Sequence, residues 1–188
     1  MAQAKTLNKQ ELKRVLDIVG VSGKHALRNR VMILMTHYCG MRIGEVASLR
    51  VGNVLASDGK ILEQIVLVAE QTKGSRSRVV YVPKRMCKEL ETYIATLKRK
   101  DSDDFLFPSQ KARCFSANSA CQLINRLYKS AGLVGATSHS GRRTLLTDLS
   151  EKGVSVFVLA ELAGHRHIST TQRYVMVNEQ MLRNAINL

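Results

Sequence analysis

Apolar residues recur at intervals of three or four positions along most of the chain, the spacing that places them on one face of an α-helix. Near the N-terminus the stripe follows Asn8, and Glu11 comes three residues later, a pair that satisfies the free backbone N–H groups at a helix start. The helical spacing is found in six segments, at residues 8–19, 25–38, 84–99, 116–129, 155–163 and 178–187. The pattern therefore predicts a mainly helical protein.

Two segments depart from the helical spacing. Residues 62–70 and 77–83 are rich in Val and Ile, and Thr72–Arg76 between them contains Gly and Ser, which predicts a β-hairpin. A further strand is expected near Val51–Leu55. Since a chain of 188 residues can bury one good core, we expect a single domain over residues 1–188. The fold class is α+β, mainly helical, with a small antiparallel β-sheet.

The charge of the chain is strongly positive. Lys and Arg number 29 against 15 Asp and Glu, which gives a net charge of +14 and an isoelectric point of about 10.0. A protein this basic most often binds a polyanion, and nucleic acid is favoured over an acidic membrane. Five Tyr, four Phe and no Trp are few rings for a surface that stacks unpaired bases, so double-stranded DNA is the expected partner.

No segment has the composition of a membrane span or a signal peptide. The longest unbroken apolar runs, such as Val31–Met35, are far too short to cross a bilayer. The four cysteines include no C-x-x-C pair and are expected to be free thiols. We therefore expect a cytoplasmic protein with no association with membranes.

Four side chains with complementary chemistry fall between residues 137 and 174, namely His139, Arg142, His165 and Tyr174. A helix that starts near Ser138 places His139 and Arg142 on one face, because they are three residues apart. Two imidazoles and a guanidinium around a phenol suit an anionic, oxygen-rich group such as a phosphate. The tyrosine oxygen is then the candidate nucleophile.

The path of the chain through this stretch decides whether the four groups meet. In an unbroken helix His165 and Tyr174 would lie on roughly opposite faces. Gly164, however, follows the predicted helix 155–163 as a left-handed stop, and Ser155 caps the start of that helix. Residues 169–172, Ser-Thr-Thr-Gln, have the pattern of a capping box, which predicts a new short helix with Tyr174 in its first turns. The chain can thus fold back and bring the four groups to one site.

An arginine and a glutamate follow the second predicted helix. Arg42 and Glu45 can share one helix face, and a carboxylate there would hold the guanidinium in the fixed pose that a phosphate clamp requires. The alternative is an ordinary surface ion pair, worth a few tenths of a kcal/mol, roughly. Taken alone the pair favours the alternative, and together with the downstream groups it favours the clamp.

The predicted hairpin is strongly basic. Lys73 at its tip could protonate a leaving oxygen, or could be a solvated residue that contacts DNA phosphates. For the remaining basic residues we expect DNA contacts, at Arg76, Arg78, Arg126, Lys129 and Arg143. His165 and His167 are two candidate metal ligands without a third, and the sequence contains no P-loop and no carboxylate cluster. No metal or cofactor is expected.

These motifs resemble the tyrosine recombinase (phage integrase) family. The matching segments are Gly40-x-Arg42-x-x-Glu45, a lysine in a hairpin at Lys73, His139-x-x-Arg142, Ala163-Gly164-His165, and Tyr174 nine residues further on. The resemblance implies the catalytic-domain fold of that family and the catalytic set Arg42, Lys73, His139, Arg142, His165 and Tyr174. Ala163 and Arg143 stand where many members have Leu and His, and neither supplies a proposed catalytic group.

The resemblance also implies an activity. A site-specific recombinase cleaves and rejoins duplex DNA through a 3′-phosphotyrosyl link, for integration, excision or inversion, with four protomers on two DNA sites. We expect a monomer without DNA and accessory DNA-bending proteins. Most members carry an N-terminal DNA-clamping domain, for which there is no room before Gly40. The predicted helix 178–187 can dock on its own core or, as often in the family, in a neighbouring subunit.

Two other functions stay open from sequence. One is a DNA-binding regulator without activity on the same fold, and the other is a type IB topoisomerase that relaxes DNA without a partner site. The filled set of six catalytic positions argues against the regulator, because a protein that only binds has no need of a tyrosine at position 174.

Overall fold

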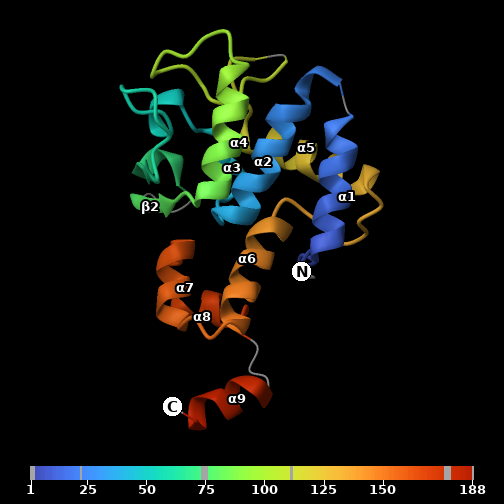
Figure 1. The fold of residues 1–188 in the computed structure, drawn as a ribbon, viewed down its shortest axis with the longest axis vertical. Coiled ribbons are helices and arrows are strands. Elements are labelled where there is room, and N and C mark those ends of the chain that lie inside the picture. The colour runs from blue at the N-terminus through green and yellow to red at the C-terminus, as the bar shows by residue number, and fades with distance from the viewer. Residues whose placement is uncertain (1–2, 22, 73–75, 111, 176–178, 188) are drawn as a thin grey trace.

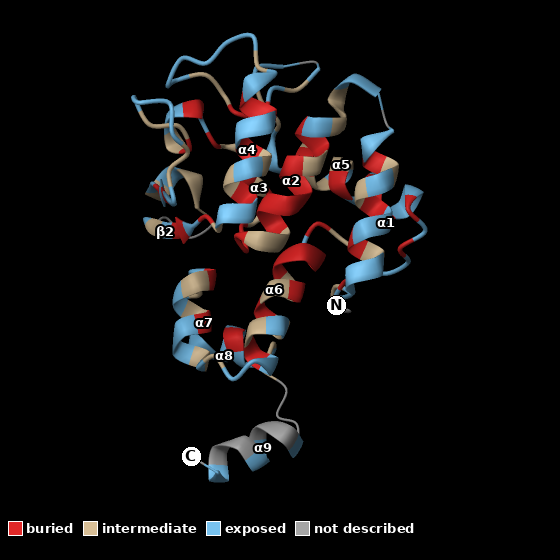
Figure 2. Cartoon of the chain, viewed as in Figure 1, coloured by how far each residue is buried: buried red, intermediate tan, exposed pale blue. Residues whose placement is uncertain are grey.

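The computed structural model describes residues 3–21, 23–72, 76–110, 112–175 and 179–187. Helix α2 (Ala26–Tyr38) runs through the centre of the larger part of the molecule and packs against α1 (Lys9–Gly20), α3 (Ile43–Ala47), α4 (Lys84–Ala95) and α6 (Ser140–Glu151) (Figure 1). Helix α5 (Ala117–Ser130) covers α1 and α3. Figure 2 shows the buried residues concentrated on α2 and on the adjoining end of α6.

Several helix boundaries agree with the predicted capping chemistry. Asn8 accepts from the backbone N of Glu11 at 2.8 Å, and Glu11 accepts from the backbone N of Asn8 at 3.0 Å, so the capping box is confirmed. Ser155 caps α7 (Val156–Ala163), and Gly164 ends it with a φ of 59°. Helix α4 stops at Ala95, earlier than predicted, because Thr96 turns back and donates its hydroxyl to the carbonyl of Tyr93.

The sheet consists of β1 (Gln64–Leu67) and β2 (Arg78–Tyr81), which pair antiparallel with Val66 opposite Val79. Its inner face is buried against the core and its outer face is exposed, the alternation expected of a sheet covered on one side. The predicted hairpin is therefore confirmed. Short 3-10 helices occur at Gly23–His25, Val51–Asn53 and Ala69–Gln71.

The prediction of a strand near Val51–Leu55 is wrong. Residues 51–53 form a 3-10 turn, and only an isolated bridge joins Leu55 to Ile61. The side chain of Asn53 accepts from the backbone N of Arg50 at 2.8 Å. This local bond closes a turn, which competes with the extended conformation of a strand.

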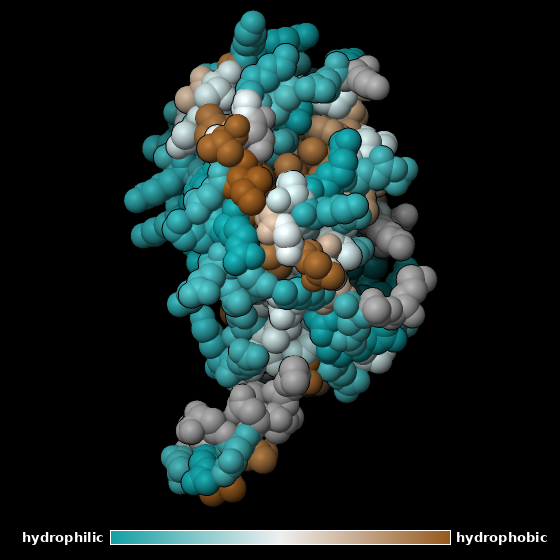
Figure 3. Space-filling model, turned by 90° about the vertical axis from the view of Figure 1, so that its right-hand side faces the viewer, coloured by the Kyte–Doolittle hydropathy of each residue, from teal (hydrophilic) through white to brown (hydrophobic). Residues whose placement is uncertain are grey.

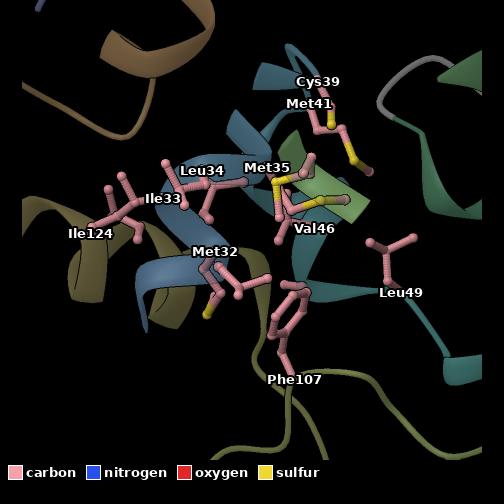
Figure 4. Close-up of a cluster of buried hydrophobic side chains, with 14 of the residues drawn as sticks. Met32, Ile33, Leu34, Met35, Cys39, Met41, Val46, Leu49, Phe107 and Ile124 are labelled. Atoms are coloured by element: carbon pink, nitrogen blue, oxygen red, sulfur yellow. The ribbon is translucent and has the colours of Figure 1, made fainter. Parts of the chain in front are cut away.

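The main core lies between α1–α5, the sheet and the loop before α5. Residues 31–36 of α2 are fully buried, as expected of a helix packed on all sides. Figure 3 shows that hydrophilic side chains cover most of the surface on the side of α1, with apolar patches scattered among them. Figure 4 shows the interior, where Met32, Met35, Met41 and Phe107 fill the space between α2, the segment after it and the loop.

A second, much smaller core holds α7 and α8 (Ile168–Gln172) on α6. Its fully buried members are Leu146, Leu159 and Ala163, and Tyr174 is among the half-buried residues packed on it. In Figure 1 these two helices lie along the end of α6 that points away from the main body. The small core, rather than the main one, thus supports the segment that ends in Tyr174.

The last helix, α9 (Glu179–Ile186), stands apart from the body in Figure 1. Leu182 and Ile186 are 55% and 85% exposed, so they are not buried on the core of their own chain. None of the helices in the described ranges is long and apolar enough to cross a membrane.

Candidate active site

Arg42 occupies the residue before α3 and is held by Glu45. Its backbone N donates to Oε2 of Glu45 at 2.8 Å, and its Nη1 donates to Oε1 at 2.9 Å. Glu45 is 1% exposed while the Arg42 side chain is 24% exposed, so the pair is not the surface ion pair of the alternative interpretation. Burial acts to raise the pKa of the Glu45 carboxyl, but hydrogen bonds and charges from Arg78 and Arg42 outweigh it and lower that pKa. Glu45 is therefore an ionised, buried anchor for a guanidinium that still reaches solvent.

Arg142 is almost fully buried in the first turn of α6. Its Nη1 donates to the carbonyl of Gly40 at 2.6 Å, and its Nη2 donates to the carbonyl of Ala163 and lies 3.0 Å from Nε2 of His165. Burial first, and then the charges of Arg42 and Arg78, lower the pKa of Arg142 to about 9. The guanidinium is thus still charged at pH 7 and is fixed between two chain segments, the end of α2 and the end of α7.

His165 follows the left-handed Gly164 and lies between Arg142 and Thr171. Its Nδ1 is 2.8 Å from the hydroxyl of Thr171, which is fully buried. Arg142 can only donate, so Nε2 accepts and the ring proton lies on Nδ1. Burial and the neighbouring guanidiniums lower the pKa of His165 to about 4. The imidazole is therefore neutral at pH 7.

Tyr174 lies against His165. The two rings are stacked, with centroids 5.8 Å apart and an interplanar angle of 15°. The predicted capping box is wrong, because α8 begins at Ile168 with His167 as its cap, and Tyr174 follows the end of the helix instead of riding in its first turns. The predicted reversal of the chain is nevertheless present, since the turn at Gly164 brings the two rings together.

His139 occupies the residue before α6 and is exposed. The helix starts at Ser140, two residues later than predicted, so His139 precedes the turn that carries Arg142. Asn125 on α5 accepts from the backbone N of Ser138 at 2.8 Å, and Cys121 lies 3.1 Å from the hydroxyl of Ser138. This support for His139 could not be predicted, because nothing in the sequence indicates that α5 contacts the turn at residue 138.

A cleft of about 340 Å³ opens beside Arg42 and His165. Its lining is rich in cationic side chains and in imidazoles, and Glu161 is the one acid among the described residues that line it: Arg42, Thr72, Arg76, Ser77, Arg78, Glu161, Gly164, His165, Arg166, His167 and Thr170. Such a lining favours an anionic ligand. Lys73 lies outside the described residues; Thr72 and Arg76, the described residues before and after the gap at 73–75, both line the cleft.

A family model described as the phage integrase family matches residues 5–181. The chain belongs to the phage integrase family. The tyrosine recombinase XerA of Thermococcus kodakarensis is 31% identical over 184 residues, which cover 96% of this chain and 61% of that protein. The chain therefore spans about three fifths of the length of this curated relative.

Solved structures agree with the family. The XerH site-specific recombinase bound to its palindromic difH substrate has a TM-score of 0.72 at 23% identity, over 100% of this chain and 54% of that one. The catalytic domain of bacteriophage HP1 integrase has a TM-score of 0.70 at 18% identity, over 99% of this chain and 95% of that one. The fold is thus the tyrosine-recombinase catalytic-domain fold, and nearly the whole length of the HP1 domain has a counterpart here.

Two of the expected DNA contacts of this integrase-family chain have other surroundings. Arg78 was expected on a solvated hairpin flank, but its side chain is 7% exposed and is paired with Glu45 at 2.6 Å. Arg143 was expected to face DNA, but its Nη1 donates to the carbonyl of Ala4 at 2.8 Å. In both cases a partner far away in sequence draws the guanidinium into the fold.

The other basic residues keep the exposure that a DNA contact requires. Arg76 lines the cleft and is exposed, and Arg126 and Lys129 are exposed on α5. Their contacts with DNA stay predictions. The structure thus joins Arg42, Arg142, His165 and Tyr174 through successive contacts and leaves His139 at the adjoining helix start.

Proposed function

We propose that this chain is the catalytic domain of a site-specific DNA recombinase that cleaves and rejoins duplex DNA through a bond between Tyr174 and a 3′-phosphate. The observation that carries the proposal is a cationic cleft lined by Arg42 and His165, with Arg142 3.0 Å from the imidazole and the ring of Tyr174 stacked on it. The three nitrogen-bearing groups suit the oxygens of a phosphodiester, and the phenol supplies a nucleophile.

Arg142 still has N–H groups that are available to bind a phosphate. A guanidinium has five, and the contacts to Gly40, Ala163 and His165 engage three of them within the described residues. The remaining two can meet non-bridging oxygens, together with the exposed part of Arg42. Because these donors are held by backbone carbonyls and by Glu45 before any ligand arrives, they need little reorganisation when charge builds up on the phosphate.

In the proposed reaction a bond forms between the oxygen of Tyr174 and phosphorus, and the bond from phosphorus to the 5′ oxygen breaks. The phenol loses a proton, and the departing 5′ oxygen gains one. His165 carries its proton on Nδ1 and accepts from Arg142 at Nε2, so neither ring nitrogen is free for the phenol proton, and we assign that proton to water in the cleft. The imidazole instead holds Arg142 and the tyrosine ring in place. Lys73 is the proposed donor to the 5′ oxygen, and His139 an additional donor to the phosphate.

The phosphotyrosyl link conserves the energy of the broken phosphodiester, so rejoining to another strand requires no ATP. For exchange between two sites we propose double-stranded DNA as the partner and four protomers on two sites, formed from monomers in the cytoplasm. Leu182 and Ile186 on α9 are exposed and apolar, which supports contact between protomers in such an assembly. Accessory DNA-bending proteins belong to the same proposal.

The test is recovery of a covalent adduct. The purified chain is incubated with a library of nicked duplex DNA without metal, denatured in detergent, and the attached DNA is sequenced while the attachment residue is found by mass spectrometry. We expect an adduct on Tyr174, and none from Tyr174→Phe, which keeps the ring and its stacking. Adducts that persist in Tyr174→Phe would refute the nucleophile. DNA binding without any adduct would favour a regulator, and relaxation of plasmids that lack a specific site would favour a topoisomerase.

A further inference from the structure

Three arginines bind three consecutive carbonyls at the C-terminal end of α7. Nη1 of Arg78 donates to Leu162 at 3.0 Å, Nη2 of Arg142 to Ala163, and Nη2 of Arg42 to Gly164 at 3.4 Å. The last carbonyls of a helix lack partners within the helix and carry the negative end of its dipole. The end of α7 is thus a common support for all three guanidiniums. Arg42 and Arg142 are proposed to bind the phosphate, whereas Arg78, which also lines the cleft, has no role assigned so far.

The surroundings of Arg78 fix it in one pose. It is the first residue of β2, and besides the carbonyl of Leu162 it contacts both oxygens of Glu45, with Nη2 at 2.6 Å from Oε2 and Nε at 3.4 Å from Oε1. Its stem passes directly beside Gly164, where an added Cβ would lie 2.4 Å from Cδ of Arg78. Gly164 is therefore required both by its left-handed conformation and by the closeness of this side chain.

Glu45 connects Arg78 to Arg42. Each oxygen of this buried carboxylate receives N–H groups from both arginines, since Oε1 faces Nη1 of Arg42 and Oε2 accepts the backbone N of Arg42. If Arg78 is removed, a carboxylate that is 1% exposed keeps Arg42 as its one guanidinium partner. The unbalanced charge then draws Arg42 towards the interior and away from the cleft.

We propose that Arg78 is a positioning residue for the phosphate-binding groups. Through Glu45 it sets the pose of Arg42, and through Leu162 and Gly164 it sets the turn that presents His165. It acts without touching the phosphate, because its side chain is 7% exposed and its fork is occupied by Glu45 and Leu162. The predicted effect of Arg78 on catalysis rests on the proposed cleavage activity. The positioning of Arg42 by Arg78 does not depend on that activity.

The deciding variant is Arg78→Lys, which keeps the charge and most of the stem but has no fork with which to bind Glu45 and Leu162 together. Arg78→Met removes the charge as well. The matched controls are Arg76→Lys and Arg76→Met, two residues away and exposed in the same cleft. Two quantities are measured separately on the DNA that the wild-type chain attaches to: the single-turnover rate of adduct formation at saturating DNA, and the dissociation constant. Melting temperature shows whether each variant is folded.

We expect Arg78→Lys to lower the rate by about 10- to 100-fold, the scale of a misplaced catalytic group, with less than about a threefold change in the dissociation constant. Arg78→Met should lose more, and the Arg76 variants, at a predicted DNA contact, should lower the affinity more than the rate. An equal loss of rate and affinity in Arg78→Lys would make Arg78 a phosphate contact. An unchanged rate, or a variant that no longer folds, would also overturn the proposal.

A measurement without DNA separates this inference from the proposed activity. In protein labelled with ¹⁵N-arginine, NMR resolves the Nε–H signals of individual arginines. Arg78→Lys should shift the signal of Arg42, and Arg76→Lys should leave it in place. If Arg42 does not respond, the positioning role is refuted even if the wild-type chain cleaves DNA. If Arg42 responds and the wild-type chain forms no adduct, the proposed activity fails and the geometric role stands.

Discussion

The two halves of the candidate site are supported by cores of very different size. Arg42 and Glu45 belong to the segment around α3, whose buried residues are part of the main core. Tyr174 packs on the small core, which has Leu146, Leu159 and Ala163 as its fully buried members. The phosphate-binding side is thus anchored in most of the protein, and the nucleophile is anchored in a few side chains.

This difference matches what each side is proposed to do. Donors that stabilise a transition state are most effective when they are fixed beforehand, and the buried contacts of Arg142 and Glu45 provide that fixation. A nucleophile must approach phosphorus and then stay attached to a strand end. Segments with few buried contacts open at a lower free energy than the whole molecule. Residues 162–165 are the point where the two halves meet, because the carbonyls there bind the three arginines.

The largest predicted effect comes from a substitution on the phosphate-binding side of the site. Arg142→Ala removes donors to the phosphate and leaves the carbonyls of Gly40 and Ala163 without their partner, so adduct formation should slow by about 100- to 1,000-fold. The dissociation constant for DNA should change far less, because many other cations contact the backbone. Single-turnover kinetics at saturating DNA give the rate, and a binding titration gives the constant. Equal losses in both would make Arg142 a residue for DNA binding alone.

Two leucines that are both 0% exposed test the difference between the cores. Each Leu→Ala change should lower the stability of the core that contains the leucine by about 2–5 kcal/mol. Leu90→Ala in α4 should lower the free energy of global unfolding, measured in urea by circular dichroism. Leu159→Ala in α7 should leave most of that transition in place, expose α7 and α8 to proteolysis, and reduce adduct formation. A global loss of equal size in both variants would mean that there is one cooperative core.

The pH dependence of stability tests the surroundings of two histidines, His37 in the main core region and His165 in the cleft. Burial lowers the pKa of His37 and of His165 to about 4, with Arg85 adding to the effect at His37 and Arg142 at His165. The unfolded chain binds protons at these sites below about pH 6.5 and the folded chain does not. The contribution of these two groups to stability should therefore be constant above about pH 6.5 and fall as the pH decreases towards 4.

Sulfate should affect the pKa values of the two histidines differently. An anion in the cleft should raise the pKa of His165 and leave that of His37 unchanged, because His37 does not line the cleft. An NMR titration of the ring protons measures both values in one sample. If sulfate raised the pKa of both or of neither, the assignment of the cleft as the phosphate site would be wrong.

The smallest predicted effect concerns an exposed cation. Arg76→Gln should weaken DNA binding several-fold and reduce the slope of log affinity against log salt concentration by about one. The measurement is a salt series of binding isotherms. A slope equal to that of the wild-type chain would remove Arg76 from the interface.

Local chemistry explains which parts of the fold were predictable from sequence. Asn8, Ser155 and Gly164 mark helix ends through bonds to nearby backbone groups, so these helix ends can be predicted from a few residues of sequence. The burial of Arg78 was not predictable, because its partner Glu45 lies 33 residues away in a different element. The sequence motifs name Arg42, Arg142, His165 and Tyr174, which the structure joins through successive contacts, and the small core that carries Tyr174 emerges only from the packing of α6, α7 and α8.

Hydrogen exchange of the protein alone, followed by mass spectrometry, tests the difference between the two halves most directly. The amides of α2 and α3 should exchange only through global unfolding, while those of α7 and α8 should exchange at least about tenfold faster, equivalent to about 1.4 kcal/mol. Equal protection of the two regions would contradict the account, because the nucleophile would then be fixed as firmly as the arginines that bind the phosphate.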